Sequence, residues 1–300
     1  MEEICLILHR KSANRPEVKE AVKAVRKSGV DLRVRIPWNK KDKPLVVREA
    51  LDAGAERLIA GGGDGTINAV CKALVGKGKR PPETELGVLP LGTANDFARG
   101  CGLPVDDLAE CLRIACTAPS FRVDVGRMNK HYFLNVASLG FGAEITATTP
   151  QPLKSVLGGG AYTLMGLAKA LDFTPYAGRI IFPGEDPIEG KMLIGAVGNC
   201  RFAGGGFEVA PKASICDGLL DLAVLTDVSS SDLTTVLREL SDPLNGENRH
   251  LVYRQVPEFT LESDVELHCN LDGEPVLKRK MKFSVLPAHL KLVAPTISPK

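Results

Sequence analysis

In residues 57–74, RLIAGGGDGTINAVCKAL, a strand pattern is followed by a cluster of glycines and then by a helix pattern. Arg57 to Ala60 has the character of a strand that runs directly into the glycines, and Thr66 to Leu74 has the apolar periodicity of a helix. Consecutive glycines leave their backbone amides open to a ligand, and the N-terminus of the following helix favours negative charge. The stretch therefore predicts a loop that holds phosphate groups. Its candidate ligands are Gly61, Gly62, Gly63, Asp64, Gly65, Thr66 and Asn68.

This loop differs from the common phosphate-binding motifs. No Gly-Lys-Ser/Thr follows the glycines, which excludes a Walker loop, and Thr66 occupies the place of the third glycine in G-x-G-x-x-G. A tight turn rich in glycine is the alternative. Asp64 favours a phosphate site, because a carboxylate beside a phosphate is unfavourable unless a divalent cation or a transferring proton lies between them.

A second loop of the same construction spans residues 89–99, LPLGTANDFAR. It leaves the end of an apolar strand and enters a helix, and taken alone its aspartate could be only an N-cap. Two such loops from neighbouring parallel strands, however, lie at the same carboxyl edge of a sheet, where open α/β folds bind ligands. The groups that this loop offers are Gly92, Thr93, Asn95 and Asp96.

The first third of the chain alternates strands and helices. Further strands are predicted at Ile4 to Leu8, Val30 to Ile36 and Leu86 to Leu91, and further helices at Pro16 to Gly29, Pro44 to Ala53 and Val105 to Cys116. This alternation predicts a mostly parallel, Rossmann-like sheet that is covered on both faces.

After about Val125 the pattern changes to short strands separated by Gly, Pro and Asp turns. The predicted strands are His131 to Ser138, Arg179 to Phe182, Met192 to Val197, Leu219 to Leu225, Glu258 to Leu261, Val265 to Leu271 and Met281 to Leu286. Helices are predicted at Ala161 to Leu171 and Ser231 to Leu240. We therefore expect an α/β domain over residues 1–125 and a β-rich domain over 126–300, whose last residues can return to the first domain. A cleft between two domains is the default ligand site.

Two acidic turns occur in the β-rich half. Asp272-Gly273 lies between apolar runs and is a hairpin signal, but Glu274 beside it also suits an acid, base or metal role. Asp217-Gly218-Leu219-Leu220-Asp221 is a second acidic turn, which leads into a strand.

Composition and charge are those of an ordinary globular chain. Of 300 residues, 44% are hydrophobic, and 38 basic residues against 36 acidic ones give a net charge of +2. This balance predicts no nucleic-acid partner. The eight cysteines show neither a C-x-x-C pair nor a zinc spacing, so we expect reduced, packed thiols.

The sequence predicts a cytoplasmic protein. The longest uncharged apolar stretch, Ser155 to Ala168, is shorter than the roughly 20 residues that a membrane span needs. The N-terminal Met1-Glu2-Glu3 has the wrong charge for a secretory signal.

Four motifs in this order resemble the diacylglycerol-kinase catalytic domain family and, within it, the bacterial YegS-type lipid kinases. They are GGDGT at 62–66, PLGTANDFA at 90–98, DGLL at 217–220 and LDGEP at 271–275. The first motif is shared with NAD kinases and with sphingosine or ceramide kinases, whereas the Asn-Asp-Phe-Ala of the second points to the lipid branch.

The resemblance implies an N-terminal nucleotide-binding domain, a C-terminal β-sandwich for the lipid substrate, ATP in the cleft between them, and transfer of the γ-phosphoryl group to a lipid hydroxyl. By analogy, Gly63 to Thr66 and Thr93 hold the phosphates, and Glu274 accepts the proton. Further members of the implied catalytic network are Asp64, Asp96 and Asp124.

The resemblance also implies a divalent cation, Mg²⁺ or Ca²⁺, at Asp217. Main-chain carbonyls at Ser214 and Leu219 would complete its site.

Two departures from the family pattern concern the polar network around the nucleotide. Ala69 stands where members usually carry a glutamate, and Pro37 stands where they carry a threonine.

Two alternatives stay open at this stage. One is a kinase for a soluble acceptor such as NAD, which the Asn95-Asp96-Phe97 motif disfavours. The other is a regulator that binds lipid or nucleotide with degenerate catalysis, which the retention of Asp64 and Glu274 disfavours.

We expect the lipid to be met by peripheral, reversible membrane contact. Val156 to Ala168 could line an acyl channel or touch a bilayer, with the entry of a buried helix as the alternative. A basic tip could contact anionic headgroups, but a solvated hairpin is favoured, since one or two such contacts are worth only about 1 kcal/mol each. Its residues are Lys278, Arg279, Lys280 and Lys282.

Overall fold

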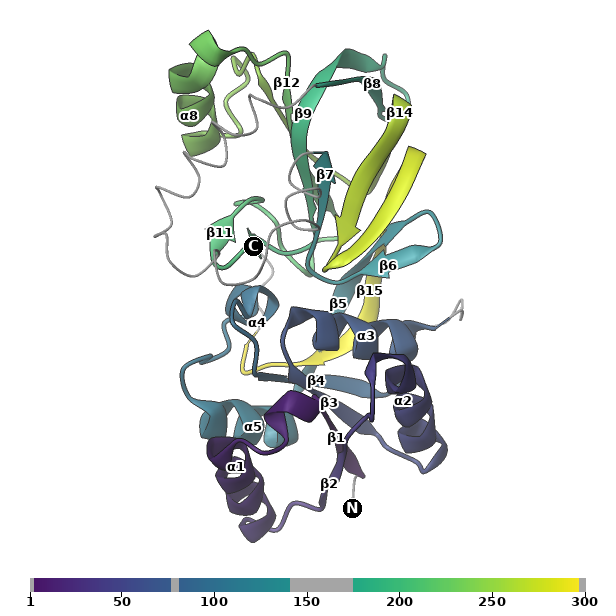
Figure 1. Cartoon of the computed structure of the whole chain (residues 1–300), viewed down its shortest axis with the longest axis vertical. Coiled ribbons are helices and arrows are strands. Elements are labelled where there is room, and N and C mark those ends of the chain that lie inside the picture. The colour runs from purple at the N-terminus through teal and green to yellow at the C-terminus, as the bar shows by residue number, and fades with distance from the viewer. Residues whose placement is uncertain (1–2, 77–80, 141–174, 297–300) are drawn as a thin grey trace. The chain divides into compact units, whose positions relative to one another are not determined.

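The computed structural model describes residues 3–76, 81–140 and 175–296, and within it the chain forms two compact units (Figure 1). The first unit comprises Met1–Val125, Ile215–Asp217 and Leu286–Lys300. The second comprises Gly126–Ser214 and Gly218–Val285.

The described strands of the first unit that pair with one another form a parallel sheet. Its strands are β1 (Ile4–Leu8), β2 (Leu32–Arg35), β3 (Arg57–Gly62), β4 (Glu85–Pro90) and the last part of β15 (Glu274–Val293). Their order is β2-β1-β3-β4-β15, and each neighbouring pair is parallel. All residues of β1 and β3 are buried, as expected for central strands of a parallel sheet that is covered on both faces.

Helices cover both faces of this sheet. In Figure 1, α1 (Pro16–Lys27) and α5 (Leu108–Thr117) lie on one face, and α2 (Lys43–Asp52) and α3 (Asp64–Val75) lie on the other. Proline at the start of α1 suits a helical N-terminus, where its missing N–H breaks no bond. Shorter elements are η1 (Arg10–Ser12), η2 (Lys40–Asp42) and α4 (Asp96–Gly100).

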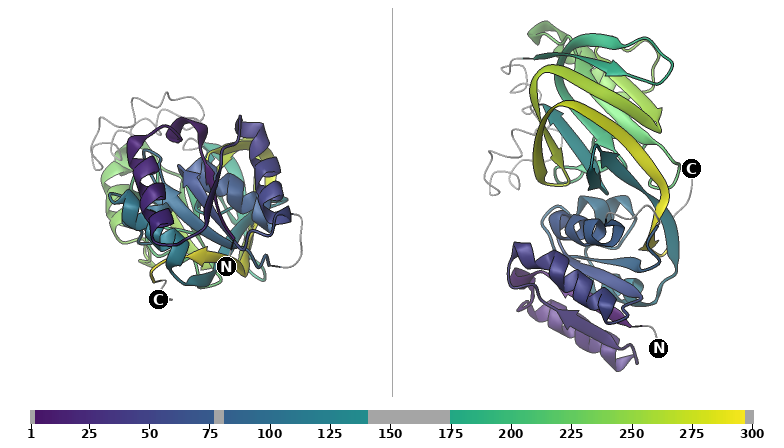
Figure 2. Two further views of the ribbon diagram at one scale, coloured as in Figure 1. Left: turned by 90° about the horizontal axis from the view of Figure 1, so that it is seen from below. Right: turned by 90° about the vertical axis from the view of Figure 1, so that its right-hand side faces the viewer.

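The second unit consists mainly of antiparallel strands (Figure 2). Its strands include β7 (Val136–Gly140), β8 (Tyr176–Ile181), β9 (Ile188–Gly198), β12 (Leu220–Thr226), β13 (Leu251–Val256) and β14 (Glu258–Leu271). They run in the order β13-β12-β9-β7-β14-β15, while β8 pairs with β9 and β14. Further strands are β5 (Ser120–Met128), β6 (His131–Phe133), β10 (Phe202–Ala203) and β11 (Phe207–Glu208).

Aromatic rings fill the core of the second unit. Phe259 and Phe283 stack with their centroids 4.9 Å apart and an interplanar angle of 13°. Phe133 meets Phe283 edge-on at 6.4 Å. Both arrangements are favourable for aromatic quadrupoles, and they tie β6, β14 and β15 together.

The prediction of a single strand over His131 to Ser138 was wrong. The strand β6 ends at Phe133, and β7 begins at Val136. The carboxylate of Asp272 accepts the N–H groups of Leu134, Asn135 and Val136, so the ladder is interrupted where these amides bond to a side chain. The carboxylate of Asp272, from a distant segment, thus accepts the amides that would otherwise bond to a neighbouring strand.

The separate strands predicted at Glu258 to Leu261 and Val265 to Leu271 are one strand, β14. Its register against β15 shifts between Glu262 and Leu267, which explains the break in the sequence pattern. The predictions for Ala161 to Leu171 and Val156 to Ala168 lie outside the described residues.

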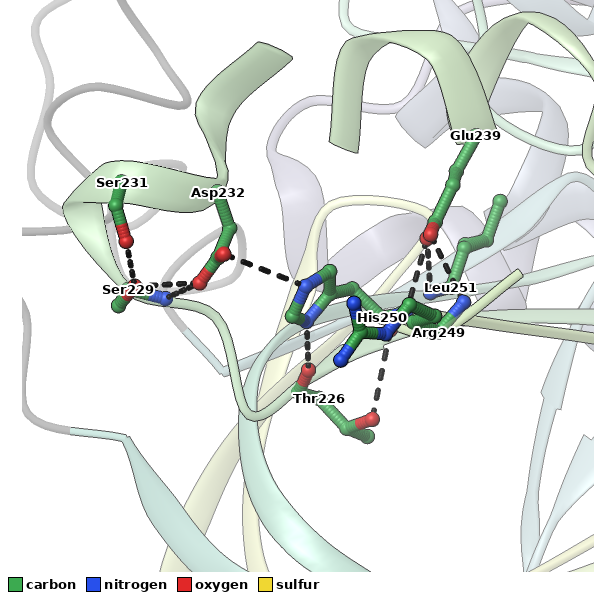
Figure 3. A network of polar contacts seen from close by, with 8 residues as sticks. All are labelled: Thr226, Ser229, Ser231, Asp232, Glu239, Arg249, His250 and Leu251. Carbon is green, nitrogen blue, oxygen red and sulfur yellow. Dashed lines mark hydrogen bonds and ion pairs between the residues drawn. The ribbon is translucent and has the colours of Figure 1, made fainter. Parts of the chain in front are cut away.

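A buried carboxylate anchors helix α8 (Leu233–Ser241), which follows η4 (Ser230–Asp232) (Figure 3). Glu239 is 2% exposed, and its two oxygens accept the N–H groups of Arg249, His250 and Leu251 at 2.8–3.0 Å. Burial alone would raise the pKa of Glu239, but the three N–H donors outweigh it and hold this pKa below its usual value. The ionised carboxylate thus ties the helix to the start of β13.

All eight cysteines are free thiols, and seven of them are buried. Over residues 3–76, 81–140 and 175–296, no helix has the length and apolar character needed to cross a membrane.

Candidate active site

Both glycine loops begin side by side at the carboxyl edge of the parallel sheet. Gly62, the last residue of β3, is paired with Pro90, the last residue of β4. The N–H of Leu91 donates to the carbonyl of Gly62 at 2.9 Å. The prediction that the two loops share one sheet edge is therefore confirmed.

Beyond the strands, the loops touch through their backbones at Gly63 and Gly92. A Cβ on Gly92 would lie 2.6 Å from the Cα of Gly63, and a Cβ on Gly63 would lie 3.1 Å from the Cα of Gly92. No side chain fits between them at this spacing. Glycine is required here so that one loop can lie against the other.

Asn95 closes the second loop on itself. Its Oδ1 accepts the N–H of Gly92 at 2.8 Å, and its Nδ2 donates to the carbonyl of Gly92 at 3.1 Å. Asn95 has a φ of +54°, a left-handed conformation that asparagine tolerates better than most residues. The predicted ligand Asn95 thus shapes the loop, and Thr93 is exposed at its tip.

Asp64 joins the first loop to the second. Its carboxylate accepts the N–H of Phe97 at 3.0 Å and the N–H of Asp96 at 3.4 Å. These amides open α4, where a negative charge is favourable. Asp64 is therefore an N-terminal cap supplied by another loop, and the side chain of Asp96 is itself 4% exposed.

Some of the remaining residues of the first loop are packed in the interior, and others are exposed. A Cβ on Gly61 would meet Leu6 Cδ1 at 2.9 Å, and one on Gly62 would meet Thr66 Oγ1 at 2.4 Å, so both glycines are packed. Gly65 is exposed with nothing within 4 Å of its Cβ position, and Asn68 is buried. Gly63 and Gly65 are thus the glycines accessible to a ligand.

Sequence reasoning missed Lys43. The side chain of Thr66 is 5% exposed, and Lys43 Nζ donates to its Oγ1 at 3.2 Å. Lys43 is the first residue of α2 and is 6% exposed. Its only sequence signal is a lysine directly before the Pro44 that opens a helical pattern.

Asp124, near the end of the first unit's part of β5, organises other segments of that unit. It is 2% exposed, and its Oδ1 accepts the N–H of Ala288 at 2.7 Å. Its own N–H donates to the carbonyl of Ile215 at 2.7 Å. These bonds give Asp124 a positioning role.

In the second unit, the two acidic residues of the LDGEP motif have different surroundings. Asp272 and Gly273 form the two-residue turn between β14 and β15, with φ of +50° and +91°. The Asp272 carboxylate is held by three amides, at 2.6 Å in the case of Leu134. Glu274 is exposed directly after the turn. Asp272 therefore fixes the hairpin that carries Glu274.

The segment before the predicted cation site is anchored by a buried pair. Tyr253 donates its hydroxyl to the carboxylate of Asp221, which is 0% exposed, and accepts the N–H of Lys212 at 3.1 Å. Burial and then the bond to Asp221 raise the pKa of the Tyr253 hydroxyl, which therefore remains a donor.

The three predicted cation ligands follow within a few residues of this anchor. Ser214 is buried and Asp217 is exposed; Ser214 and Leu219 belong to the second unit and Asp217 to the first. Among the residues with described positions, His, Cys, Asp and Glu do not gather in a group of three or more that could hold a metal ion.

Comparison with known proteins identifies both halves of the chain. Residues 3–128 match the diacylglycerol kinase catalytic domain, and residues 135–294 match the YegS C-terminal NAD kinase β-sandwich-like domain. A curated relative from Chromohalobacter salexigens, named "probable lipid kinase YegS-like", is 46% identical over 295 residues. The match covers 97% of this chain and 92% of the relative.

Solved structures share the fold. A diacylglycerol kinase from Bacillus anthracis str. Sterne has a TM-score of 0.74 at 19% identity, and the match covers 98% of this chain and 97% of that chain. An NAD kinase from Archaeoglobus fulgidus in complex with ATP has a TM-score of 0.51 at 10% identity, with coverages of 97% and 93%.

The two matched domains define a kinase-type catalytic domain followed by a β-sandwich-like domain. The chain belongs to the diacylglycerol kinase catalytic domain family, in the arrangement that carries a YegS-type C-terminal domain. The family predicted from the four motifs is confirmed.

Proposed function

We propose that this chain is an ATP-dependent lipid kinase that transfers the γ-phosphoryl group of ATP to a hydroxyl group of a lipid. The observation that carries the proposal is the backbone contact of two glycine loops at Gly63 and Gly92, tied together by the Asp64 carboxylate. Family membership assigns this pair of loops to a kinase domain. The first unit would then be a Rossmann-like nucleotide domain and the second would take the lipid.

Phosphoryl transfer depends on alignment and charge neutralisation more than on covalent help from the protein. Backbone amides at Gly63 and Gly65 and the hydroxyl of Thr93 orient the phosphates. The lipid oxygen bonds to the γ-phosphorus while the bond from that phosphorus to the bridging oxygen breaks and ADP leaves. The proton of the lipid hydroxyl passes to the carboxylate of Glu274, the exposed acid of the hairpin.

The residues around Asp217 suit a hard divalent cation. A carboxylate from Asp217 and main-chain carbonyls from Ser214 and Leu219 are all oxygen donors, which Mg²⁺ and Ca²⁺ prefer. A bound cation would offset phosphate charge during transfer. The Asp221–Tyr253 pair holds the preceding segment in place for this role.

Contact with a membrane would use only part of the basic tip. Lys280 Nζ lies 2.7 Å from Glu262, and Lys282 Nζ lies 2.8 Å from Glu258, so both charges are offset by glutamates. Lys278 and Arg279 are exposed, and they would face anionic headgroups. At about 1 kcal/mol for each cation, such contact is weak and reversible.

An assay with radiolabelled ATP tests the proposal against its two alternatives. The purified chain is incubated with diacylglycerol, monoacylglycerol, phosphatidylglycerol, a sphingoid base or NAD. Label in a lipid supports the proposal, and label only in NAD supports a kinase for a soluble acceptor. Binding of nucleotide without transfer to any acceptor supports the regulator.

The role of Glu274 is tested with Glu274→Gln. We expect turnover to fall roughly 10²- to 10⁴-fold, the usual contribution of a general base, with a much smaller change in ATP affinity. Glu266→Gln, at an exposed position on the same hairpin, is the matched control and retains activity. Unchanged turnover in Glu274→Gln would remove this residue from the role of base.

A further inference from the structure

A groove lies in the first unit between α1 and β2, the strand at the edge of the parallel sheet (Figure 1). Its volume is about 600 Å³, within the range of about 300–1,000 Å³ that is usual for small-molecule sites. From Val18 to Lys27 the groove follows α1 for about 14 Å, at the helical rise of about 1.5 Å per residue. Neither glycine loop contributes a residue to its described lining.

Aliphatic side chains form the apolar part of the lining. They include Leu8 at the end of β1, Val34 in β2, Val18 and Val22 in α1, and Ile36 directly after β2. Val22 and Val34 are half-buried, and Ile36 is 48% exposed, so part of this apolar surface is open to solvent. A ligand that covers it gains the free energy of removing apolar area from water.

All charged side chains of the lining are basic and exposed. They are Lys19, Lys23, Arg26 and Lys27 of α1. Neighbours three and four residues apart lie on the same side of a helix, which brings these charges together. Arg26 donates to the carbonyl of Leu32, a neutral acceptor, at 2.8 and 3.0 Å. The ion pairs within the described part of this unit include none of the three lysines.

The two parts of the lining lie at opposite ends of the groove. The bond from Arg26 to Leu32 joins the end of α1 to the start of β2, so the basic cluster of Lys23, Arg26 and Lys27 lies at that end. Leu8 and Ile36 come from the ends of their strands, at the other end of the groove. The groove is therefore basic at one end and aliphatic at the other.

This pattern selects among possible ligands. Every polar side chain in the lining is a lysine or arginine, and both residue types only donate hydrogen bonds. A peptide in the groove would bring N–H groups as well as carbonyls, and its N–H groups would need acceptors. An acyl chain has no polar groups to satisfy, and an anionic group at its end accepts charge-assisted bonds from ammonium groups.

We propose that the groove binds a single-chain anionic lipid, a molecule with one acyl chain that ends in a carboxylate or a phosphate. The head group lies at Lys23 and Lys27, and the chain extends along the aliphatic surface toward Leu8 and Ile36. The inference goes beyond the proposed kinase activity and does not depend on it, because the glycine loops take no part in the lining.

The test is equilibrium dialysis of labelled oleate, below its micelle concentration, against the full-length chain. We expect the double variant Lys23→Gln, Lys27→Gln to bind oleate roughly 10- to 30-fold more weakly, about fivefold for each lysine. The matched control is Lys41→Gln, Lys130→Gln, which removes the same charge at exposed positions outside the groove and should bind within twofold of wild type. Unchanged affinity in the groove variant, or equal losses in both variants, would overturn the proposal.

Chain length and a competitor test the apolar part of the lining. Affinity should rise severalfold for each added pair of methylene groups from octanoate to oleate, whereas acetate and inorganic phosphate should not bind measurably. An affinity that is independent of chain length would reduce the groove to a patch of charge. A peptide of ten glutamates should not displace oleate; displacement would assign the groove to an acidic protein segment and would refute the proposal.

Trp38, the single tryptophan, reports on the aliphatic end. It is 75% exposed and follows Ile36 by two residues. Saturating oleate should shift its emission to shorter wavelengths, and an unchanged spectrum would place the bound chain elsewhere.

Two further outcomes concern a bilayer and the kinase. Binding to phosphatidylglycerol vesicles that only the groove variant loses, without binding of monomeric oleate, would assign the groove to a bilayer and overturn the proposal. Oleate binding by a chain that phosphorylates no acceptor would support the inference while the proposed function fails. Phosphorylation of a lipid without oleate binding would refute the inference alone.

Discussion

Replacing Gly92 with alanine tests whether the two glycine loops must lie in contact. The added Cβ would stand 2.6 Å from Gly63 Cα and 2.9 Å from Asn95 Oδ1. Carbon atoms in ordinary contact are about 3.5–4.0 Å apart, so the loops must separate by roughly 1 Å. Gly63 Cα is a backbone atom, and no rotamer change can relieve the overlap.

The expected cost follows from this overlap. Inserting a methyl group into a packed site typically costs about 1–3 kcal/mol. Separation of the loops would also strain the bond from Gly92 N–H to Asn95 Oδ1, which is 2.8 Å long. We expect Gly92→Ala to lower the free energy of unfolding by about 2 kcal/mol and to lower kinase turnover with it.

The control is Gly65→Ala in the first glycine loop, which faces the loop of Gly92. Gly65 lies in the first turn of α3 with nothing within 4 Å of its Cβ position, so alanine should leave stability unchanged or raise it by about 0.4–1 kcal/mol. Urea denaturation is followed by circular dichroism and by the fluorescence of Trp38, the single tryptophan, which reports on the first unit. An unchanged urea midpoint for Gly92→Ala, or equal losses in both variants, would refute the reasoning.

Two further predictions concern carboxylates that bond to backbone amides. Asp272→Ala leaves three amides without their acceptor and should cost about 3 kcal/mol or more, whereas Glu274→Ala, at an exposed position, should stay within about 0.5 kcal/mol. Equal unfolding midpoints in urea would contradict this. Because the pKa of Glu239 is lowered by folding, its contribution is complete above the unfolded value of about 4.3 and is lost as pH falls through the folded pKa. The stability difference between wild type and Glu239→Gln should therefore shrink in acid, and a constant difference from pH 7 to pH 3 would contradict the assignment.

Much of the fold follows from local pattern. The apolar run of β1 and the periodicity of α1 and α3 predicted those elements, because a buried parallel strand and an amphipathic helix each need a distinct spacing of apolar residues. The prediction of one continuous strand failed between Phe133 and Val136. The pattern there is typical of a strand, but the backbone amides bond to Asp272. A pattern of neighbouring residues cannot predict a bond to Asp272, which lies 138 residues from Leu134 in the chain.

The candidate site, like the fold, was predicted from the sequence only in part. The glycine motifs predicted two loops at one sheet edge, since strand ends and glycine runs are visible in the order of residues. Burial of Lys43 was not predicted, because α2 must first pack beside α3 before the lysine can reach Thr66. The same holds for Asn95, whose amide turns back onto its own loop.

The sequence by itself determined the family, the alternation of strands and helices in the first unit, and the positions of the acidic turns, because each depends on residues that are neighbours along the chain. Only the tertiary structure decided which carboxylates accept backbone amides and which acidic residue lies at an exposed position. Asp64 meets Phe97 across 33 residues, and Asp272 meets Leu134 across 138, while Glu274 stays exposed. A hydrogen bond depends on distance in space, and folding alone brings such distant donors and acceptors within 3 Å of one another.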